Sequence, residues 1–296
     1  MDLMQYGVTH NIEDEVSYRF VAYLIGLLLA FESMLLLACC CVSIIYGERD
    51  LMSFIVSFAL CLSVSAILLV YGRRRKCAMS RNEGYIVVAL SWVFFSVFGM
   101  VPYLWGGFIP NITDAFFETM SGFTTTGATI LDNIESMPHG ILFWRSLTQW
   151  IGGLGIVCFT IVLLPGFGAS SQMLYLSEAT GVTHNKLYPK TRVMARYIFM
   201  VYILLTAIES ALLMAGGMGL FDALCHSMTT TATGGFSTKQ ESIAYWHSPY
   251  MEYVVSIFML LSAINFSLYI VAFKSKWKTL REFVELKWFA CSVGLL

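Results

Sequence analysis

Two short stretches of this sequence carry the residue types that could hold a cation. They contain threonines, glycines and one alanine: Thr124, Thr125, Thr126 and Gly127 in the first, and Thr231, Ala232, Thr233 and Gly234 in the second. Threonine supplies a side-chain oxygen, glycine allows backbone angles that other residues avoid, and backbone carbonyls replace the hydration shell of K⁺ in channel filters. We therefore expect ion coordination at a filter for K⁺, with no catalytic group and no tightly bound cofactor.

The two stretches belong to an internal repeat. Each is preceded by Asp-Ala, at Asp114 and Asp222, and each ends in Thr-x-Thr-Gly, which places Gly127 and Gly234 107 positions apart. Aligning both landmarks requires one inserted residue in the first copy. Glycine and threonine also pack membrane helices, but two copies at corresponding places favour a shared ion pathway over packing alone.

A helical pattern precedes each stretch, at 113–123 and at 221–230. A helix of about 11 residues rises about 16 Å, roughly half of the ~30 Å bilayer core. Non-helical backbone at membrane depth is tolerated only beside protein or water. We predict that each segment is a re-entrant pore helix followed by a filter loop, with Thr113 or Asp114 as the N-cap of the first.

Longer apolar runs surround these segments. With 57% hydrophobic and 12% charged residues, the 296-residue chain is not a soluble enzyme, since soluble domains carry about a quarter charged residues. Six runs are long enough to cross a bilayer: 20–46, 51–71, 85–109, 141–165, 197–221 and 253–273. The predicted fold class is an all-α polytopic membrane protein, in which a two-helix hairpin precedes two complete repeats of span, re-entrant pore helix, filter loop and span.

The same pattern predicts the domain organisation. The hairpin and its basic cytoplasmic loop occupy 1–83, the first pore-loop repeat 84–190, the second repeat 191–281, and the truncated start of a third repeat 282–296. That last stretch is shorter than the roughly 20 residues that cross a bilayer, so we expect a truncated chain. Most lysines and arginines gather between alternate spans, which predicts a cytoplasmic N-terminus.

Several residues near the stretches are candidates for support. Arg145 is a charge at membrane depth that could pair with Glu118 of the first short helix or tune the potential at the pore entrance. Gly152 and Gly153 permit close helix packing, with a hinge as the alternative. His226 is interpreted as a solitary histidine, so the only metal expected is K⁺ at the filter residues. The net charge of −1 gives no reason to expect nucleic acid.

Longer strings around these residues carry a family resemblance. They are Ser-Gly-Phe-Thr-Thr-Thr-Gly-Ala-Thr at 121–129, Phe-Trp-Arg-Ser-Leu-Thr-Gln-Trp-Ile-Gly-Gly-Leu-Gly-Ile at 143–156, Ala-Thr-Gly-Gly-Phe-Ser-Thr at 232–238 and Asn-Phe-Ser-Leu at 265–268. Together they resemble the Trk/Ktr/HKT superfamily of potassium transporters, and within it the bacterial Trk membrane subunits. The resemblance implies four repeats around one pore, a bacterial inner-membrane location and a peripheral nucleotide-binding regulatory subunit. It marks Asn265 as a further supporting residue and leaves coupling to H⁺ or Na⁺ open.

The predicted function is potassium uptake across the membrane by a truncated Trk-type subunit. The expected partners are K⁺, membrane lipids and a second copy of the chain, since two copies about a two-fold axis would place four loops around one path. One alternative is an inactive or interaction-only half-subunit. The other is a polytopic membrane enzyme, which is disfavoured because the sequence offers no nucleophile–base set, metal-ligand spacing or phosphate loop.

Overall fold

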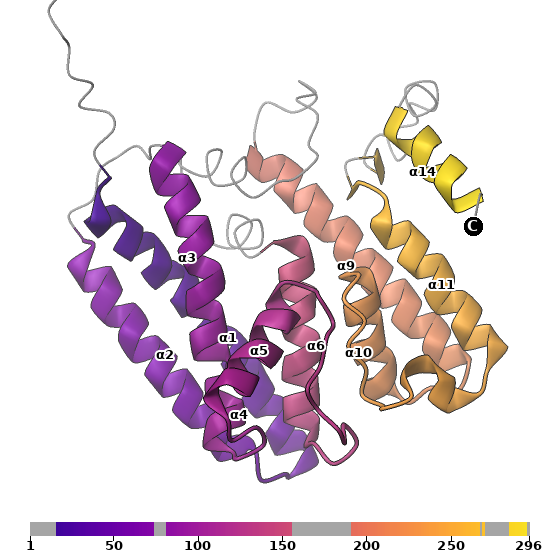
Figure 1. The fold of residues 1–296 in the computed structure, drawn as a ribbon, viewed down its shortest axis with the longest axis horizontal. Coiled ribbons are helices and arrows are strands. Elements are labelled where there is room, and N and C mark those ends of the chain that lie inside the picture. The colour runs from indigo at the N-terminus through magenta and orange to yellow at the C-terminus, as the bar shows by residue number, and fades with distance from the viewer. Residues whose placement is uncertain (1–15, 74–80, 156–190, 267, 270–283, 295–296) are drawn as a thin grey trace, which may run out of the picture.

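The computed structural model describes residues 16–73, 81–155, 191–266, 268–269 and 284–294, and within them the chain is helical without strands (Figure 1). The helices in chain order are α1 (Tyr18–Tyr46), α2 (Leu51–Tyr71), α3 (Arg81–Gly99), α4 (Val101–Trp105), α5 (Ile112–Phe123), α6 (His139–Leu154), α9 (Thr191–Ala215), α10 (Leu220–Thr231), η3 (Ser242–Trp246), α11 (Pro249–Ala263) and α14 (Val284–Gly294).

The first two long helices form a tight antiparallel hairpin. Gly47 ends α1 with a φ of 65°, in the left-handed region that favours glycine, and the chain turns directly into α2. Small residues let the two helices approach closely, since a Cβ on Gly26 would lie 3.1 Å from Leu68 and the Ser65 hydroxyl donates to the Gly26 carbonyl at 2.7 Å. The two helices of the predicted hairpin are therefore in close contact around Gly26.

Four helical stretches are long and apolar enough to cross a membrane: Tyr18–Tyr46, Leu51–Tyr71, Asn82–Trp105 and Ala195–Ala215. The predicted all-α polytopic membrane fold is confirmed. The remaining two predicted spans correspond to α6, with 16 residues, and α11, with 15 residues. The later parts of runs 141–165 and 253–273, like most of the basic clusters, lie outside the described residues.

Two helices of 12 residues, α5 and α10, occupy the places predicted for short helices. The predicted cap of α5 is wrong: Asn111 is the N-cap, and its side-chain oxygen accepts the Thr113 amide at 3.0 Å. An asparagine oxygen satisfies one of the amides left unpaired at a helix start, which frees Thr113 and Asp114 to lie inside the first turn. Gly219 begins α10 without a side-chain cap.

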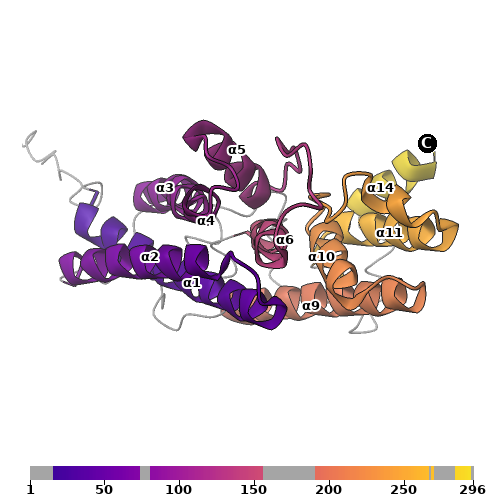
Figure 2. The ribbon, with the colours of Figure 1, turned by 90° about the horizontal axis from the view of Figure 1, so that it is seen from below.

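Helix α6 lies between the α1–α5 group and the α9–α11 group (Figure 2). It packs against α1, α5 and α10. The Trp144 side chain is fully buried on it, and its indole N–H donates to the Gly99 carbonyl at 2.9 Å. Helix α6 is thus a wall that the two short helices share.

Candidate functional site

The first Thr–Gly loop, Thr124–Ile130, leaves α5 through a reversal of the backbone. Thr125 and Gly127 have φ values of 53° and 75°. The Thr125 and Thr126 amides donate to the carbonyls of Gly122 and Ser121, each at 3.0 Å. A left-handed threonine costs about 1–2 kcal/mol, so this conformation has to be held by its surroundings.

The second Thr–Gly loop, Ala232–Thr238, repeats this backbone. Thr233 and Gly235 have φ values of 55° and 83°. The Thr233 amide donates to the Thr230 carbonyl at 2.8 Å, and the Gly234 amide donates to the Thr229 carbonyl at 2.9 Å. Each feature lies 108 positions after its counterpart in the first loop.

This constant spacing shows that the predicted one-residue insertion is wrong. The counterpart of Gly127 is Gly235 rather than Gly234, because the left-handed glycine comes second in the Gly-Gly pair. Thr231 is the last residue of α10, where its hydroxyl donates to the Ser227 carbonyl at 2.8 Å. The stretch equivalent to Thr124–Gly127 is therefore Ala232–Gly235.

The two loops lie against each other and are open on one side. A Cβ on Gly127 would collide with the Gly234 carbonyl oxygen. Thr124, Thr126 and Thr233 are exposed. Among the hydrogen bonds that the described residues form with one another, none ends on a carbonyl of 124–127 or 232–235. The arrangement offers hydroxyl and carbonyl oxygens, the ligands that replace a cation's hydration shell.

A buried ion pair holds the end of the first loop. The Arg145 Nε donates to the Glu118 Oε1 at 2.9 Å, with side-chain exposures of 1% and 0%. Glu118 also accepts the Thr129 hydroxyl at 2.9 Å and the Ile130 amide at 3.0 Å. The structure thus contains the predicted pair, and its carboxylate binds the loop directly.

Arg145 also reaches the second loop. Its Nη1 donates to the Ser237 carbonyl at 3.0 Å, and its guanidinium lies 4.3 Å from the centre of the Phe236 ring. One turn further along α6, the Gln149 Oε1 accepts the Phe236 amide at 3.0 Å. Gln149 was missing from the predicted site, although its place four residues after Arg145 puts it on the same helix face.

The two glycines at the end of α6 permit the contacts of both short helices. A Cβ on Gly152 would collide with the Phe123 carbonyl oxygen, at the end of α5. A Cβ on Gly153 would lie 2.7 Å from the Cα of Ala232 and from the Tyr202 hydroxyl. This geometry agrees with the packing interpretation of Gly152 and Gly153 rather than with a hinge.

His226 occupies in α10 the place that Glu118 has in α5, 108 positions earlier. Its Nδ1 lies 2.8 Å from the Asp222 carbonyl and its Nε2 lies 2.9 Å from the Ser237 hydroxyl. Because a carbonyl can only accept, Nδ1 carries a proton, and in the neutral ring, which burial favours, Nε2 accepts from the Ser237 hydroxyl. His226 is thus a buried single histidine, which agrees with its interpretation from the sequence. Its contact with the second loop was not foreseen, and an ungapped alignment of the repeats would have shown its equivalence to Glu118.

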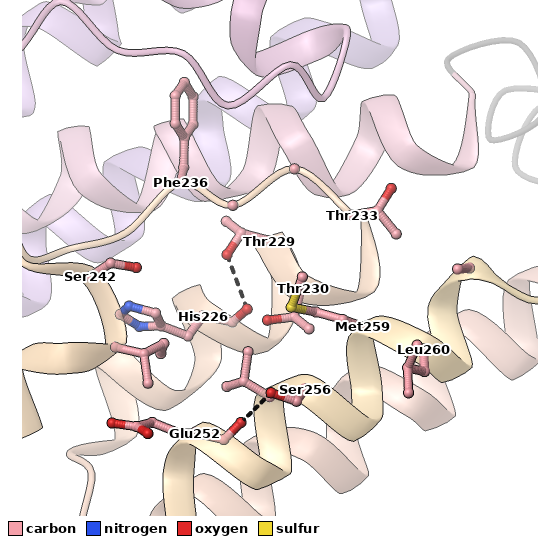
Figure 3. A pocket seen from close by; sticks show the side chains of 15 residues that line it. His226, Thr229, Thr230, Thr233, Phe236, Ser242, Glu252, Ser256, Met259 and Leu260 are labelled. Atoms are coloured by element: carbon pink, nitrogen blue, oxygen red, sulfur yellow. Dashed lines mark hydrogen bonds between the residues drawn. The ribbon is translucent and has the colours of Figure 1, made fainter. Parts of the chain in front are cut away.

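A pocket of about 700 Å³ lies between the second loop and α11 (Figure 3). Its lining includes His226 and Thr233 on one side and Glu252, Ser256 and Met259 of α11 on the other. The second loop is therefore held by α6 on one flank and faces an open space on the other.

Asn265, the remaining predicted supporting residue, lies just beyond α11. Ile264 ends that helix in an extended conformation, and the half-buried Asn265 follows it. The Asn265 carbonyl accepts the Leu268 amide at 2.9 Å. Ala263, two residues earlier in the chain, lines the pocket.

A second contact joins the two repeats beyond the loops. The Gln240 amide donates to the Glu135 carboxylate at 2.8 Å, which lowers the pKa of Glu135. The Gln240 side-chain oxygen accepts the Ile134 amide at 3.3 Å in return. The segments that follow the two loops are thus tied to each other.

Comparisons with known proteins agree with this architecture. The chain is 37% identical over 255 residues to the Trk system potassium uptake protein TrkH of Salmonella typhimurium, covering 85% of this chain and 53% of that protein. It is 35% identical over 275 residues to TrkG of Escherichia coli K12, covering 92% and 56%. The crystal structure of the potassium transporter TrkH from Vibrio parahaemolyticus matches with a TM-score of 0.74 and 35% identity, over 88% of this chain and 53% of that one.

The chain thus spans about half the length of these relatives. The family model for TrkH, described as "Cation transport protein", matches residues 50–295. That range contains both Thr–Gly loops, α6 and all the side chains that hold the loops. The sequence match and the shared fold lead to one conclusion: this chain is a member of the TrkH family of cation transport proteins.

Proposed function

We propose that the two Thr–Gly loops form two walls of a K⁺ path through the membrane and that the chain serves Trk-type potassium uptake. One observation carries this proposal. Two short helices end in loops with the same left-handed threonine, the same left-handed glycine and the same amide bonds, and the loops meet at Gly127 and Gly234. The relatives named as potassium uptake proteins support K⁺ as the ion.

The chemistry of the path is coordination. Carbonyl and threonine oxygens of 124–127 and 232–235 would replace water around the ion. The C-terminal ends of α5 and α10 precede the loops, so the negative ends of both helix dipoles favour a cation there. Glu118, Arg145 and Gln149 keep the oxygens at a fixed spacing because they bind the loops from behind.

Two loops supply two walls, and a closed path around one ion requires more. The remaining walls come from a second copy related by a two-fold axis, or from further chain of the kind that the longer relatives contain. A peripheral nucleotide-binding subunit is the regulatory partner that we propose, and H⁺ or Na⁺ are the candidate coupling ions.

The test is cation uptake in bacteria that lack their own K⁺ uptake systems. Cells expressing the chain should grow at low K⁺ and take up Rb⁺ in preference to Na⁺. Gly127→Ser should abolish that preference, because the added atoms displace the Gly234 carbonyl. Gly107→Ser is the matched control, since Gly107 also has a left-handed φ, 68°, but faces open space. Membrane insertion without growth would favour the inactive half-subunit, and an unchanged Rb⁺ to Na⁺ ratio in Gly127→Ser would remove the filter assignment.

A further inference from the structure

The turn between α1 and α2 brings two acidic side chains to the start of another helix. Glu48 and Asp50 both lie at the first turn of α6, about ninety positions later in the chain. Asp50 is fully buried. It occupies the N-cap position of α2, which aspartate favours, yet its side chain makes no cap hydrogen bond there. Neither of its carboxylate oxygens forms a hydrogen bond with another described residue, so a buried acid without such a partner lies beside the start of α6.

Helix α6 begins without a cap of its own. Pro138 stands at its N-cap and offers no side-chain acceptor, so the first amides of the helix need partners from outside. Glu48 supplies one, because its carboxylate accepts the His139 amide and lies 2.8 Å from the His139 Nδ1. The Tyr46 ring stacks on the His139 ring at 3.9 Å, nearly parallel at 5°.

Asp50 lies at the next residue of α6. A Cβ on Gly140 would collide with the Asp50 Oδ2 and with the Ser43 hydroxyl, so glycine is what lets the carboxylate reach the helix start. Burial raises the pKa of Asp50, while the Ser43 hydroxyl and the Ile141 amide act to lower it. A negative charge is favoured at this end of a helix.

We propose that Glu48 and Asp50 are positioning residues for the second Thr–Gly loop. They fix the point at which α6 begins, and α6 carries Arg145 and Gln149, which bind that loop. Arg145 and Gln149 lie about 9 and 15 Å along the helix from His139, at about 1.5 Å per residue. A displacement of the first turn is therefore transmitted along a continuous helix to both contacts.

The N-terminal hairpin, whose helices lie apart from the loops, thus controls the loop geometry through one turn. The positioning itself requires no assumption about the transported ion. Its consequence for K⁺ selectivity rests on the proposed function.

Amide hydrogen exchange of the full chain in detergent tests the positioning. Asp50→Ala and Gly140→Ala break the same contact from its two sides. Each should speed exchange in the peptide 233–240 by up to about fivefold, the upper end of the effect of a negative charge lost from the start of a helix. The double variant should exchange no faster than either single variant, since the contact can be lost only once. Asp132→Asn, which removes an exposed acid not involved in the contact, should leave the peptide unchanged.

Milder variants protect the test against loss of folding. Asp50→Asn and Glu48→Gln preserve side-chain size and should give smaller increases in the same peptide. Faster exchange confined to the turn at 47–50 and the start of α6, with the loop unchanged in all variants, would overturn the proposal. If loop exchange rises while the Rb⁺ to Na⁺ uptake ratio stays constant, the positioning stands and the proposed function fails.

Discussion

The first and second Thr–Gly loops have the same backbone conformation, but the side chains that hold them differ in charge. In the first, the ionic Glu118 accepts the Thr129 hydroxyl and pairs with Arg145. In the second, the neutral His226 accepts the hydroxyl of Ser237, the residue equivalent to Thr129. The comparison shows that the loop shape requires a partner for this hydroxyl and does not require a charge.

Among the described residues, the helix that follows the first loop also supports the second loop, but the helix that follows the second loop does not support the first. We call this one-directional support. Helix α6 follows the first loop in the chain, yet its Arg145 and Gln149 bind the second loop. The helix that follows the second loop, α11, borders a pocket instead. A substitution that disturbs α6 is therefore expected to loosen both loops, whereas loss of the His226 contact should loosen only the second loop.

The largest effect is expected from Arg145→Leu. The change leaves Glu118 buried without its cation, a situation that costs about 3–5 kcal/mol. It also removes the donor to the Ser237 carbonyl, so both loops should exchange amide hydrogens faster. Thermal unfolding in detergent measures the first effect and hydrogen exchange measures the second.

A double variant separates charge from geometry. Arg145→Leu with Glu118→Leu should recover much of the stability, since apolar residues can replace a buried pair, while the second loop stays loosened. Arg196→Leu is the control because Arg196 is exposed on α9 and belongs neither to the turn at 47–50 nor to the loops. Full recovery of the second loop in the double variant would show that Arg145 holds only the first.

An intermediate effect should distinguish the two equivalent glycines. Gly235→Ala meets no atom within 4 Å and incurs only the left-handed backbone cost of about 1–2 kcal/mol. Gly127→Ala incurs that cost and also collides with the Gly234 carbonyl. We expect a clearly lower unfolding midpoint for Gly127→Ala. Equal midpoints would mean that the loops do not touch as described.

The smallest effect is expected from His226→Leu. The hydrogen bond to Ser237 is lost, but the Ser237 hydroxyl oxygen still accepts the Lys239 amide at 2.9 Å. The substitution leaves no buried charge without a partner. The expected cost is about 1 kcal/mol. Exchange should rise in the second loop alone, and a rise in the first loop of similar size would contradict the one-directional support.

The sequence allowed much of the fold to be predicted because apolar length and internal repetition are strong signals. The long helices follow from the length of the apolar runs, and the two short helices follow from the repeated pattern. The pairing of Arg145 with Glu118 follows from the rule that charges within a membrane need partners. The caps were less predictable: Asn111, Thr113 and Asp114 are all good cap residues, and only the backbone angles decide among them.

The side chains that support the second loop could not be predicted from the sequence, for a physical reason. Gly234 completes the Thr-x-Thr-Gly pattern, and Gly235 follows it directly. From the sequence either glycine could correspond to Gly127, and only the positive φ of Gly235 identifies it as the equivalent residue. The resulting shift hid the match between His226 and Glu118. Gln149 was missed because its partner is a backbone amide, which leaves no trace in residue types.

The shared wall formed by α6 also has a consequence for synthesis of the protein. Arg145 emerges 27 residues after Glu118, so its charge has a partner as soon as α6 is made. Gln149 must wait for Phe236, which lies 87 residues later. At about 5–20 residues per second, that delay is roughly 4–17 s. The Arg145 charge therefore gains its carboxylate partner during translation, while the Arg145 Nη1 and the neutral Gln149 amide wait for their partners in the second repeat.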